Sequence, residues 1–177
     1  MVFNELKRFV VEKLGPEAWN TLLVQAGLEG RTYLPRATYP DTEAVALVTA
    51  ASKVTGRPAG DILEDFGLFI SGDLLAMYSA HLDPSWDALD VIEHTEETVH
   101  RVVRMKTPGA APPGLRSQRP SKDEVIVFYD SGRHMCGLAK GIVRGIAAHY
   151  KEEVQVREPT CMLSGAPRCE IHVSRVG

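Results

Sequence analysis

The stretch DEVIVFYDSGR (residues 123–133) decides how the second half of the chain folds. Its first seven residues are rich in β-branched and aromatic side chains, which favour a strand, and a glycine-containing turn follows. Residues 137–150 carry apolar side chains at helical spacing, and residues 153–156 and 169–173 again favour strands. The pattern predicts a small α+β unit made of a sheet and a helix.

The first 110 residues have a different pattern, in which apolar side chains recur every three or four positions. Asp41 is placed to cap one helix, and residues 86–105 form the longest helix candidate. Residues 107–120 are dense in Pro and Gly, which cannot continue a helix. We therefore expect one α+β domain over residues 1–177, with a helical subdomain at 1–110 and a smaller α+β subdomain at 111–177.

The composition excludes several classes of protein. The chain has 20 Lys and Arg residues against 23 Asp and Glu residues, so its net charge of -3 offers no attraction to nucleic acid. No apolar run approaches the roughly 18 residues needed to span a membrane, and the N-terminal residues form an amphipathic pattern rather than a targeting segment. We expect a cytoplasmic protein that binds neither nucleic acid nor membrane.

Two histidines lie on different faces of the helix expected over residues 86–105. An apolar stripe runs along this helix, made of Leu89, Ile92, Val99 and Val103. His100 lies at the edge of the stripe and faces the interior, whereas His94 lies on the opposite side. His100 is either a core histidine bonded to a backbone carbonyl or an axial ligand to a haem iron, which requires a neutral imidazole in an apolar pocket.

Tyr129, Ser131 and Arg133 follow one another at two-residue spacing at the end of the strand expected over residues 123–129. If the strand continues, all three side chains point to the same side. A phenol, a hydroxyl and a guanidinium together favour a carboxylate or phosphate ligand, and Arg133 can bind such a group with two hydrogen bonds. The alternative is a solvated strand end without a ligand.

The order and spacing of these residues resemble the haem nitric oxide/oxygen binding family, called H-NOX. This family includes domains of soluble guanylate cyclase and bacterial gas sensors. The resemblance rests on His100, on the prolines at 112–113 and on the sequence YDSGR at 129–133, and it covers essentially the whole chain.

The resemblance implies a haem b held between the helical subdomain and a C-terminal subdomain with an antiparallel sheet and a helix. His100 would bind the iron, and Pro113 would press on the porphyrin. The haem propionates would be bound by Tyr129, Ser131 and Arg133. Haem is a flat apolar plate with two carboxylates at one edge, so it needs an apolar slot, an axial ligand and a cationic edge, and the chain offers all three.

The distal side of the implied pocket is expected to be apolar. Leu138 stands where oxygen-binding members of the family place a tyrosine. The other distal residues are Val2, Leu6, Phe9 and Ile70. Because tightly bound oxygen needs a hydrogen-bond donor and nitric oxide does not, the resemblance implies a preference for nitric oxide.

Gly137, Gly141 and Gly145 recur every four residues on one face of the helix expected over residues 137–150. Such a face lets another helix or the porphyrin approach closely. Of these two interpretations we favour helix packing.

The three cysteines, Cys136, Cys161 and Cys169, form a further candidate site. Some family members carry a structural zinc at these places, with a histidine a few residues before the second cysteine, where this chain has Glu158. Zinc accepts sulfur, nitrogen and oxygen ligands, so the candidates for the fourth ligand are Glu158, His134 and His172. The alternatives are a thiol or disulfide redox switch and simple buried cysteines.

Together these features predict a haem-based nitric oxide sensor of the bacterial type that acts by binding rather than as an enzyme. A cysteine hydrolase using Cys136 and His134 is disfavoured, since residues two apart on a helix point away from each other. By resemblance, the signalling partner is a histidine kinase, a cyclic-dinucleotide enzyme or a chemotaxis receptor. The alternative function is a haem-free zinc or thiol redox-sensing module that uses the three cysteines.

Overall fold

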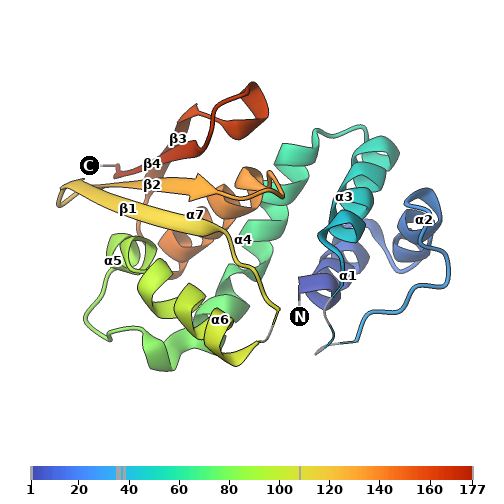
Figure 1. The fold of residues 1–177 in the computed structure, drawn as a ribbon, viewed down its shortest axis with the longest axis horizontal. Helices are drawn as coiled ribbons and strands as arrows, with labels where there is room; N and C mark the ends of the chain where they lie inside the picture. The colour runs from blue at the N-terminus through green and yellow to red at the C-terminus, as the bar shows by residue number, and fades with distance from the viewer. Residues whose placement is uncertain (1, 35–36, 38, 108, 177) are drawn as a thin grey trace.

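The structure is a computed structural model that describes residues 2–34, 37, 39–107 and 109–176. Its α-helices are α1 (Val2–Leu14), α2 (Ala18–Gln25), α3 (Asp41–Thr55), α4 (Ala59–Tyr78), α5 (Ala88–Glu93), α6 (Arg101–Lys106) and α7 (Cys136–His149). The short helices are η1 (Ser79–His81), η2 (Glu96–His100) and η3 (Met162–Ser164), and the strands are β1 (Gly114–Ser121), β2 (Glu124–Asp130), β3 (Val154–Thr160) and β4 (Cys169–Arg175). Figure 1 shows α1 to α3 at one end of the molecule and the sheet at the other.

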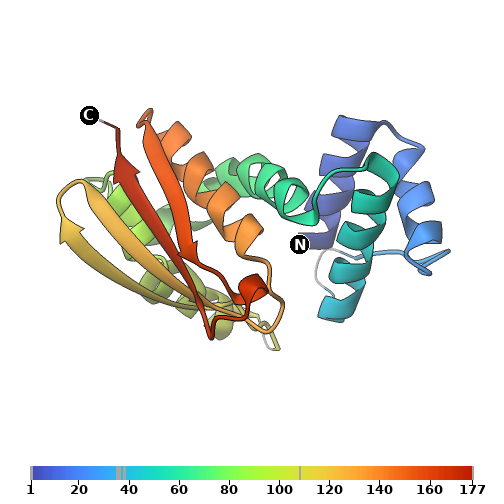
Figure 2. The same ribbon diagram turned by 90° about the horizontal axis from the view of Figure 1, so that it is seen from above.

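The described strands form one antiparallel sheet in the order β1-β2-β4-β3. Side chains alternate between its two faces, as a strand dictates. The neighbouring strands β2 and β4 share one buried face of the sheet. On this face Val125 pairs with Val173, Val127 with Ile171 and Tyr129 with Cys169. Figure 2 shows α5 and α7 covering one face of the sheet. The predicted α+β class is confirmed.

Two groups of buried side chains hold the fold together. The first, here called the helical core, includes Leu6, Phe9, Leu22, Leu47, Phe66 and Ile70. The second, here called the sheet core, includes Leu75, Leu89, Ile92, Val127, Val143 and Ile171. The long helix α4 contributes to both, and Ile142 of α7 packs against both. The two cores therefore meet along α4 and α7, and the division of the chain at residues 110 and 111 stays a prediction.

The helices α4 and α7 are in very close contact because glycines face each other. A Cβ atom on Gly141 would collide with the carbonyl oxygen of Glu64 and lie 2.9 Å from the Cα of Gly67. A Cβ atom on Gly145 would collide with the side chain of Ser71. Only glycine allows two backbones to approach this closely. The helix-packing interpretation of the glycine stripe is confirmed.

The continuous helix predicted over residues 86–105 is wrong. A capping box between Asp87 and Asp90 begins α5, which ends at Glu93, and the five-residue π-helix η2 then leads into α6. The amide of His100 donates to the carbonyl of Thr95, five residues back, at 3.0 Å. Such π-helical turns widen a helix locally, and apolar periodicity alone does not reveal them.

The strand β1 was missed within the connection predicted over residues 107–120. It is an edge strand that pairs only with β2, and its register shifts between Gln118 and Ser121, beside Pro120. Proline is tolerated in edge strands because its missing N–H is not needed for pairing there. The high proline content of this segment therefore does not exclude a strand. Pro108, part of that connection, lies outside the described residues.

Candidate functional site

His100 is the last residue of η2, and its side chain is only 14% exposed. Its Nδ1 lies 3.0 Å from Oε2 of Glu96. Burial lowers the pKa of His100 below its ordinary value, although Glu96 opposes this shift, so the neutral imidazole is favoured. His94, in contrast, is 43% exposed and stacks on Trp86. His100 is thus a largely enclosed imidazole whose lowered pKa favours the neutral form.

Pro113 lies beside His100, and its backbone acts to raise the pKa of the imidazole. The next residues join the sheet, where Leu115 pairs with Tyr129 and Gly114 pairs with Asp130. Two residues before Pro113, the carbonyl of Ala111 accepts a hydrogen bond from the guanidinium of Arg133. The connection after α6 therefore runs from His100 to the end of β2 and brings the two halves of the candidate site together.

Tyr129 and Ser131 are 3% and 8% exposed, respectively. Burial raises the pKa of Tyr129, which therefore stays a protonated phenol. The predicted shared strand face is wrong in one respect, because β2 ends at Asp130 and the chain then turns towards α7. The amide of Arg133 bonds back to Oγ of Ser131 at 3.3 Å within that turn.

Arg133 extends from this turn to the helical half of the molecule. Its Nε lies 3.5 Å from Oδ2 of Asp41, the first residue of α3. The predicted role of Asp41 as a helix cap is wrong, since Pro40 occupies the N-cap position without a capping side chain. Asp41 is a neighbour of the candidate site that the sequence did not reveal, because Asp41 and Arg133 are far apart in the chain.

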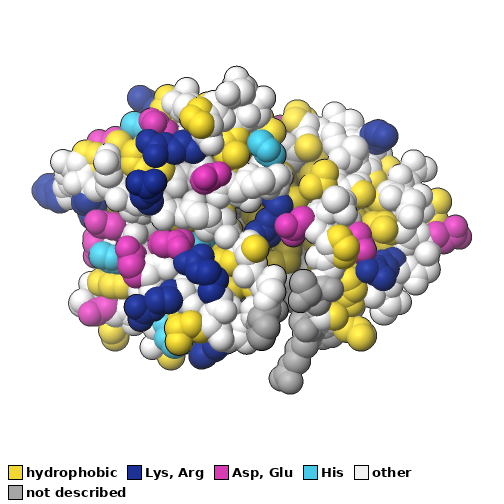
Figure 3. Space-filling model, in the orientation of Figure 1, with side chains coloured by type: hydrophobic (Ala, Val, Ile, Leu, Met, Phe, Trp, Pro, Cys, Tyr) yellow, Lys and Arg dark blue, Asp and Glu magenta, His cyan; other side chains and the backbone are white. Residues whose placement is uncertain are grey.

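The residues expected on the distal side lie mostly together. Leu6, Phe9 and Ile70 are buried in the helical core, and Leu138 packs against it. Val2 is the exception, since it is 45% exposed and lies outside that core. The face shown in Figure 3 is hollowed between the sheet half and the α1–α3 half, with hydrophobic side chains in its depth.

These observations fit a haem in their chemistry. A neutral imidazole on η2, a protonated phenol on β2, and a hydroxyl and a guanidinium in the turn after β2 gather around the connection between α6 and β1. The helical core, to which α1, α4 and α7 contribute, supplies the apolar side chains. An axial ligand, donors for two carboxylates and an apolar surface are the three requirements of this cofactor.

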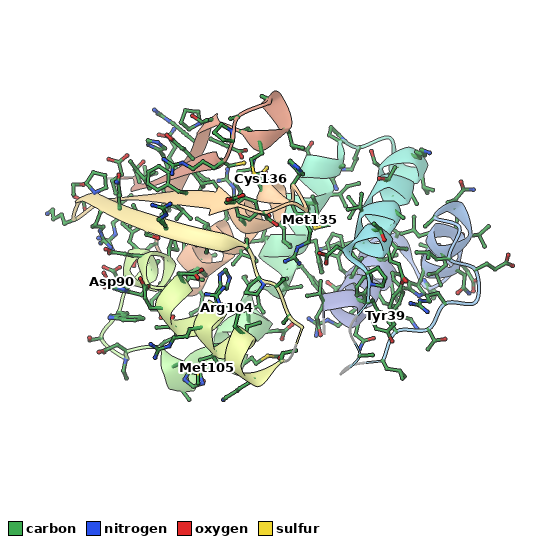
Figure 4. All side chains as sticks on the ribbon, in the orientation of Figure 1. Tyr39, Asp90, Arg104, Met105, Met135 and Cys136 are labelled. Atoms are coloured by element: carbon green, nitrogen blue, oxygen red, sulfur yellow. The ribbon has the colours of Figure 1, made fainter. Side chains whose placement is uncertain are left out.

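The three cysteines come together at a second site. Sγ of Cys161 lies 3.7 Å from Sγ of Cys136 and 3.9 Å from Sγ of Cys169, and none of the three forms a disulfide. Figure 4 shows Cys136 at the start of α7. Burial raises the pKa of Cys136, and it raises that of Cys169 to about 11. Without a cation, the thiols of Cys136 and Cys169 therefore stay protonated.

Glu158 is the fourth member of this group. One of its oxygens and the three sulfurs all lie within 4.8 Å of one another. Its Oε2 pairs with Lys140 at 3.0 Å, whereas its Oε1 is buried and has no hydrogen-bond partner within the described part of the chain. Of the candidates for a fourth ligand, only Glu158 joins the sulfurs. His172 lies on the other face of the sheet, 3.4 Å from Glu124, and His134 is exposed.

Within the described ranges, no helix has both the length and the hydrophobicity that crossing a bilayer requires. A family model described as Haem-NO-binding matches residues 1–158. The fold is similar to that of an H-NOX protein from S. oneidensis in the Fe(II)NO state, with a TM-score of 0.91 and 24% identity over 99% of this chain and 98% of that one.

Two further structures show the same fold. The unliganded Fe(II) H-NOX protein from K. algicida has a TM-score of 0.90 and 20% identity, covering 99% of this chain and 95% of that one. A mutant of the H-NOX protein from T. tengcongensis has a TM-score of 0.84 and 21% identity, covering 99% of this chain and 96% of that one. With the family match over residues 1–158, the chain belongs to the haem-NO-binding, or H-NOX, family.

Proposed function

We propose that this protein is a haem-based nitric oxide sensor that acts by binding and not by turnover. The observation that carries the proposal is the course of the connection between α6 and β1. It places the backbone of Pro113 beside His100, and the carbonyl of Ala111 accepts a hydrogen bond from Arg133. Haem b supplies a ferrous iron to which a diatomic gas binds. The chain supplies His100 to hold the iron and Pro113 to lie against the porphyrin, and Tyr129, Ser131 and Arg133 hold the propionates.

The preference for nitric oxide rests on the side chains expected around the gas. Leu6, Phe9, Ile70 and Leu138 are hydrocarbon or aromatic side chains without a hydrogen-bond donor. Such a surface gives bound oxygen no stabilising hydrogen bond. Nitric oxide would need no such donor, so these residues would favour it over oxygen.

The signal is a conformational change passed to a separate protein in the cytoplasm. Arg133 contacts both the connection and α3, so a movement of the site changes how α1 to α3 lie against the sheet half. The partner classes that we propose, from the family resemblance, are a histidine kinase, a cyclic-dinucleotide enzyme or a chemotaxis receptor of a bacterium.

The test is an absorption spectrum of protein purified after haem-supplemented expression, before and after nitric oxide is added in the ferrous state. We expect a haem band that shifts with nitric oxide. His100→Ala should lose haem, or keep it only when imidazole is supplied, whereas His94→Ala should match the unmodified protein. Equal haem retention in both variants would overturn the role of His100.

A second candidate function is zinc and thiol sensing at Cys136, Cys161, Cys169 and Glu158. It is favoured by Glu158, which places one carboxylate oxygen among three sulfurs and has a buried Oε1 without a hydrogen-bond partner among the described residues, so a cation would stabilise the group. Protein kept reduced throughout should contain about one equivalent of zinc, and its removal by a chelator should loosen the sheet half. Glu158→Gln should weaken zinc binding, and Glu170→Gln, on the other face of the sheet, should not. If the reduced protein contains no zinc, the zinc site is disproved.

A further inference from the structure

Glu96 is not among the residues that the family resemblance assigns to the haem, yet three donors meet at its carboxylate. Its Oε2 accepts from Nδ1 of His100 at 3.0 Å and from the amide of Leu115 at 3.3 Å. Its Oε1 accepts from the guanidinium of Arg104. Glu96 therefore connects η2, α6 and β1 around one imidazole.

The local helix geometry explains this arrangement. Glu96 and His100 are the first and last residues of η2, four positions apart, so their side chains face each other. The hydrogen bond from the amide of Leu115 at the start of β1 fixes the carboxylate relative to the sheet. Arg104 follows His100 by four residues and extends from α6, as Figure 4 shows.

The hydrogen bond to Glu96 also sets which nitrogen of His100 is free. A neutral imidazole has one N–H; the Glu96 carboxylate and the Pro113 backbone lie beside the ring, and the Arg104 guanidinium bonds to the other oxygen of Glu96. A carboxylate is a stronger acceptor than a backbone carbonyl, so the proton belongs on Nδ1. Nε2 then has a free lone pair, as an axial ligand requires.

We propose that Glu96 is a positioning residue that orients His100 and sets how strongly its Nε2 binds iron, and that Arg104 limits this effect. The inference rests on the proposed function. A carboxylate bonded to the outer nitrogen of a ligating histidine makes the inner nitrogen more basic. Arg104 shares the same carboxylate, so it withdraws part of the negative charge that His100 would otherwise receive.

The two substitutions Glu96→Gln and Arg104→Gln act in opposite directions. Glu96→Gln retains an acceptor but removes the charge, so the iron–histidine stretching frequency of the ferrous protein should fall. Haem affinity should drop by about tenfold or more, as for other outer partners of metal ligands. Arg104→Gln leaves Glu96 with its full charge, so the frequency should rise. The matched control is Glu97→Gln, at an exposed neighbour that lies 4.0 Å from His94, which should change neither quantity.

A merely structural role would not produce shifts of opposite sign. Equal frequencies in all variants, or a fall in both Glu96→Gln and Arg104→Gln, would overturn the inference while leaving the haem assignment intact. A separate readout uses the haem-free protein, in which nitrogen NMR of His100 should show the Nδ1–H tautomer. The Nε2–H tautomer there would also overturn the inference. Failure of the unmodified protein to bind haem would instead overturn the proposed function.

Discussion

Arg133 and Asp41 join the two halves of the molecule across the candidate haem site. The Nε atom of Arg133, just beyond β2, lies 3.5 Å from Oδ2 of Asp41 at the start of α3. The same guanidinium donates to the carbonyl of Ala111. Asp41 therefore competes for the cation that we assign to the haem propionates.

This relationship predicts different effects of two substitutions on haem dissociation. Arg133→Ala should speed haem loss, since two carboxylates lose their cation. Asp41→Asn frees Arg133 and should leave haem loss unchanged or slow it by no more than about fivefold, because an exposed ion pair contributes roughly 1 kcal/mol at most. The measurement is transfer of haem to an acceptor protein.

Tyr129→Phe is the comparison for Arg133→Ala, because it removes one hydroxyl and retains the ring. A single hydrogen bond contributes about 0.5–1.5 kcal/mol, so haem loss should speed up by about two- to tenfold, less than for Arg133→Ala. If Asp41→Asn speeds haem loss as much as Arg133→Ala does, Arg133 acts as a structural link between the halves and not as a propionate ligand.

The contact between α4 and α7 predicts a large difference between two Gly→Ala substitutions. A methyl group at Gly141 would meet the backbone of Glu64 and Gly67, which cannot move aside as a side chain can. Gly141→Ala should lower the free energy of unfolding by about 1–3 kcal/mol or more. In Gly72→Ala, on α4, the methyl group has no described atom within 4 Å, and better helix propensity should raise the free energy of unfolding by up to about 1 kcal/mol. Urea denaturation of the haem-bound protein measures both, and similar values for the two variants would contradict the packing argument.

The ion pairs at the start of α5 predict an acid-sensitive contribution to stability. Burial would raise the pKa of Asp87, but the amide of Asp90 and the guanidinium of Arg175 outweigh it, so the pKa lies below the ordinary value. A carboxyl whose pKa is lowered by folding stabilises the fold above its unfolded pKa, near 4, and loses this contribution as pH falls through the folded value. Asp87→Asn should therefore be less stable than the unmodified protein at pH 7, and the difference should shrink below pH 4. If the difference in stability between Asp87→Asn and the unmodified protein stays constant down to pH 2, the ionisation of Asp87 does not contribute to the pH dependence of folding.

Sequence reasoning found the elements whose patterns are local. The alternation in β2 and the helical spacing in α7 depend on neighbouring residues, and both elements appear within one residue of their predicted bounds. The strand β1 was not predicted because its Pro and Gly residues disfavour a strand locally, and pairing of Gly114–Gln118 and Ser121 with β2 outweighs that preference.

The same limit applies to the candidate site. His100 and the YDSGR residues were found because their spacing is a recognisable signal. Asp41 was not, since its contact with Arg133 joins residues 92 positions apart, and only the fold brings them together. The contact between Glu96 and His100 could have been predicted from the sequence, because residues four apart on a helix face each other. The π-helical turn that sets the geometry of this pair could not, since apolar periodicity does not reveal it.

Ligand selectivity is the prediction that depends most directly on the distal side chains. A ferrous haem would hold oxygen tightly only where a side chain donates a hydrogen bond to it, and Leu6, Ile70 and Leu138 have no donor. The ferrous protein in air should therefore form no stable oxygen complex, yet it should bind nitric oxide tightly and lose its bond to His100. Leu138 is partly buried against the helical core, so Leu138→Tyr places a phenol beside the apolar cluster and should create measurable oxygen affinity. Leu138→Phe adds the same ring without the hydroxyl and should not. Absorption spectra in air and under nitric oxide check all three proteins, and a long-lived oxygen complex in the unmodified protein would refute its selectivity for nitric oxide.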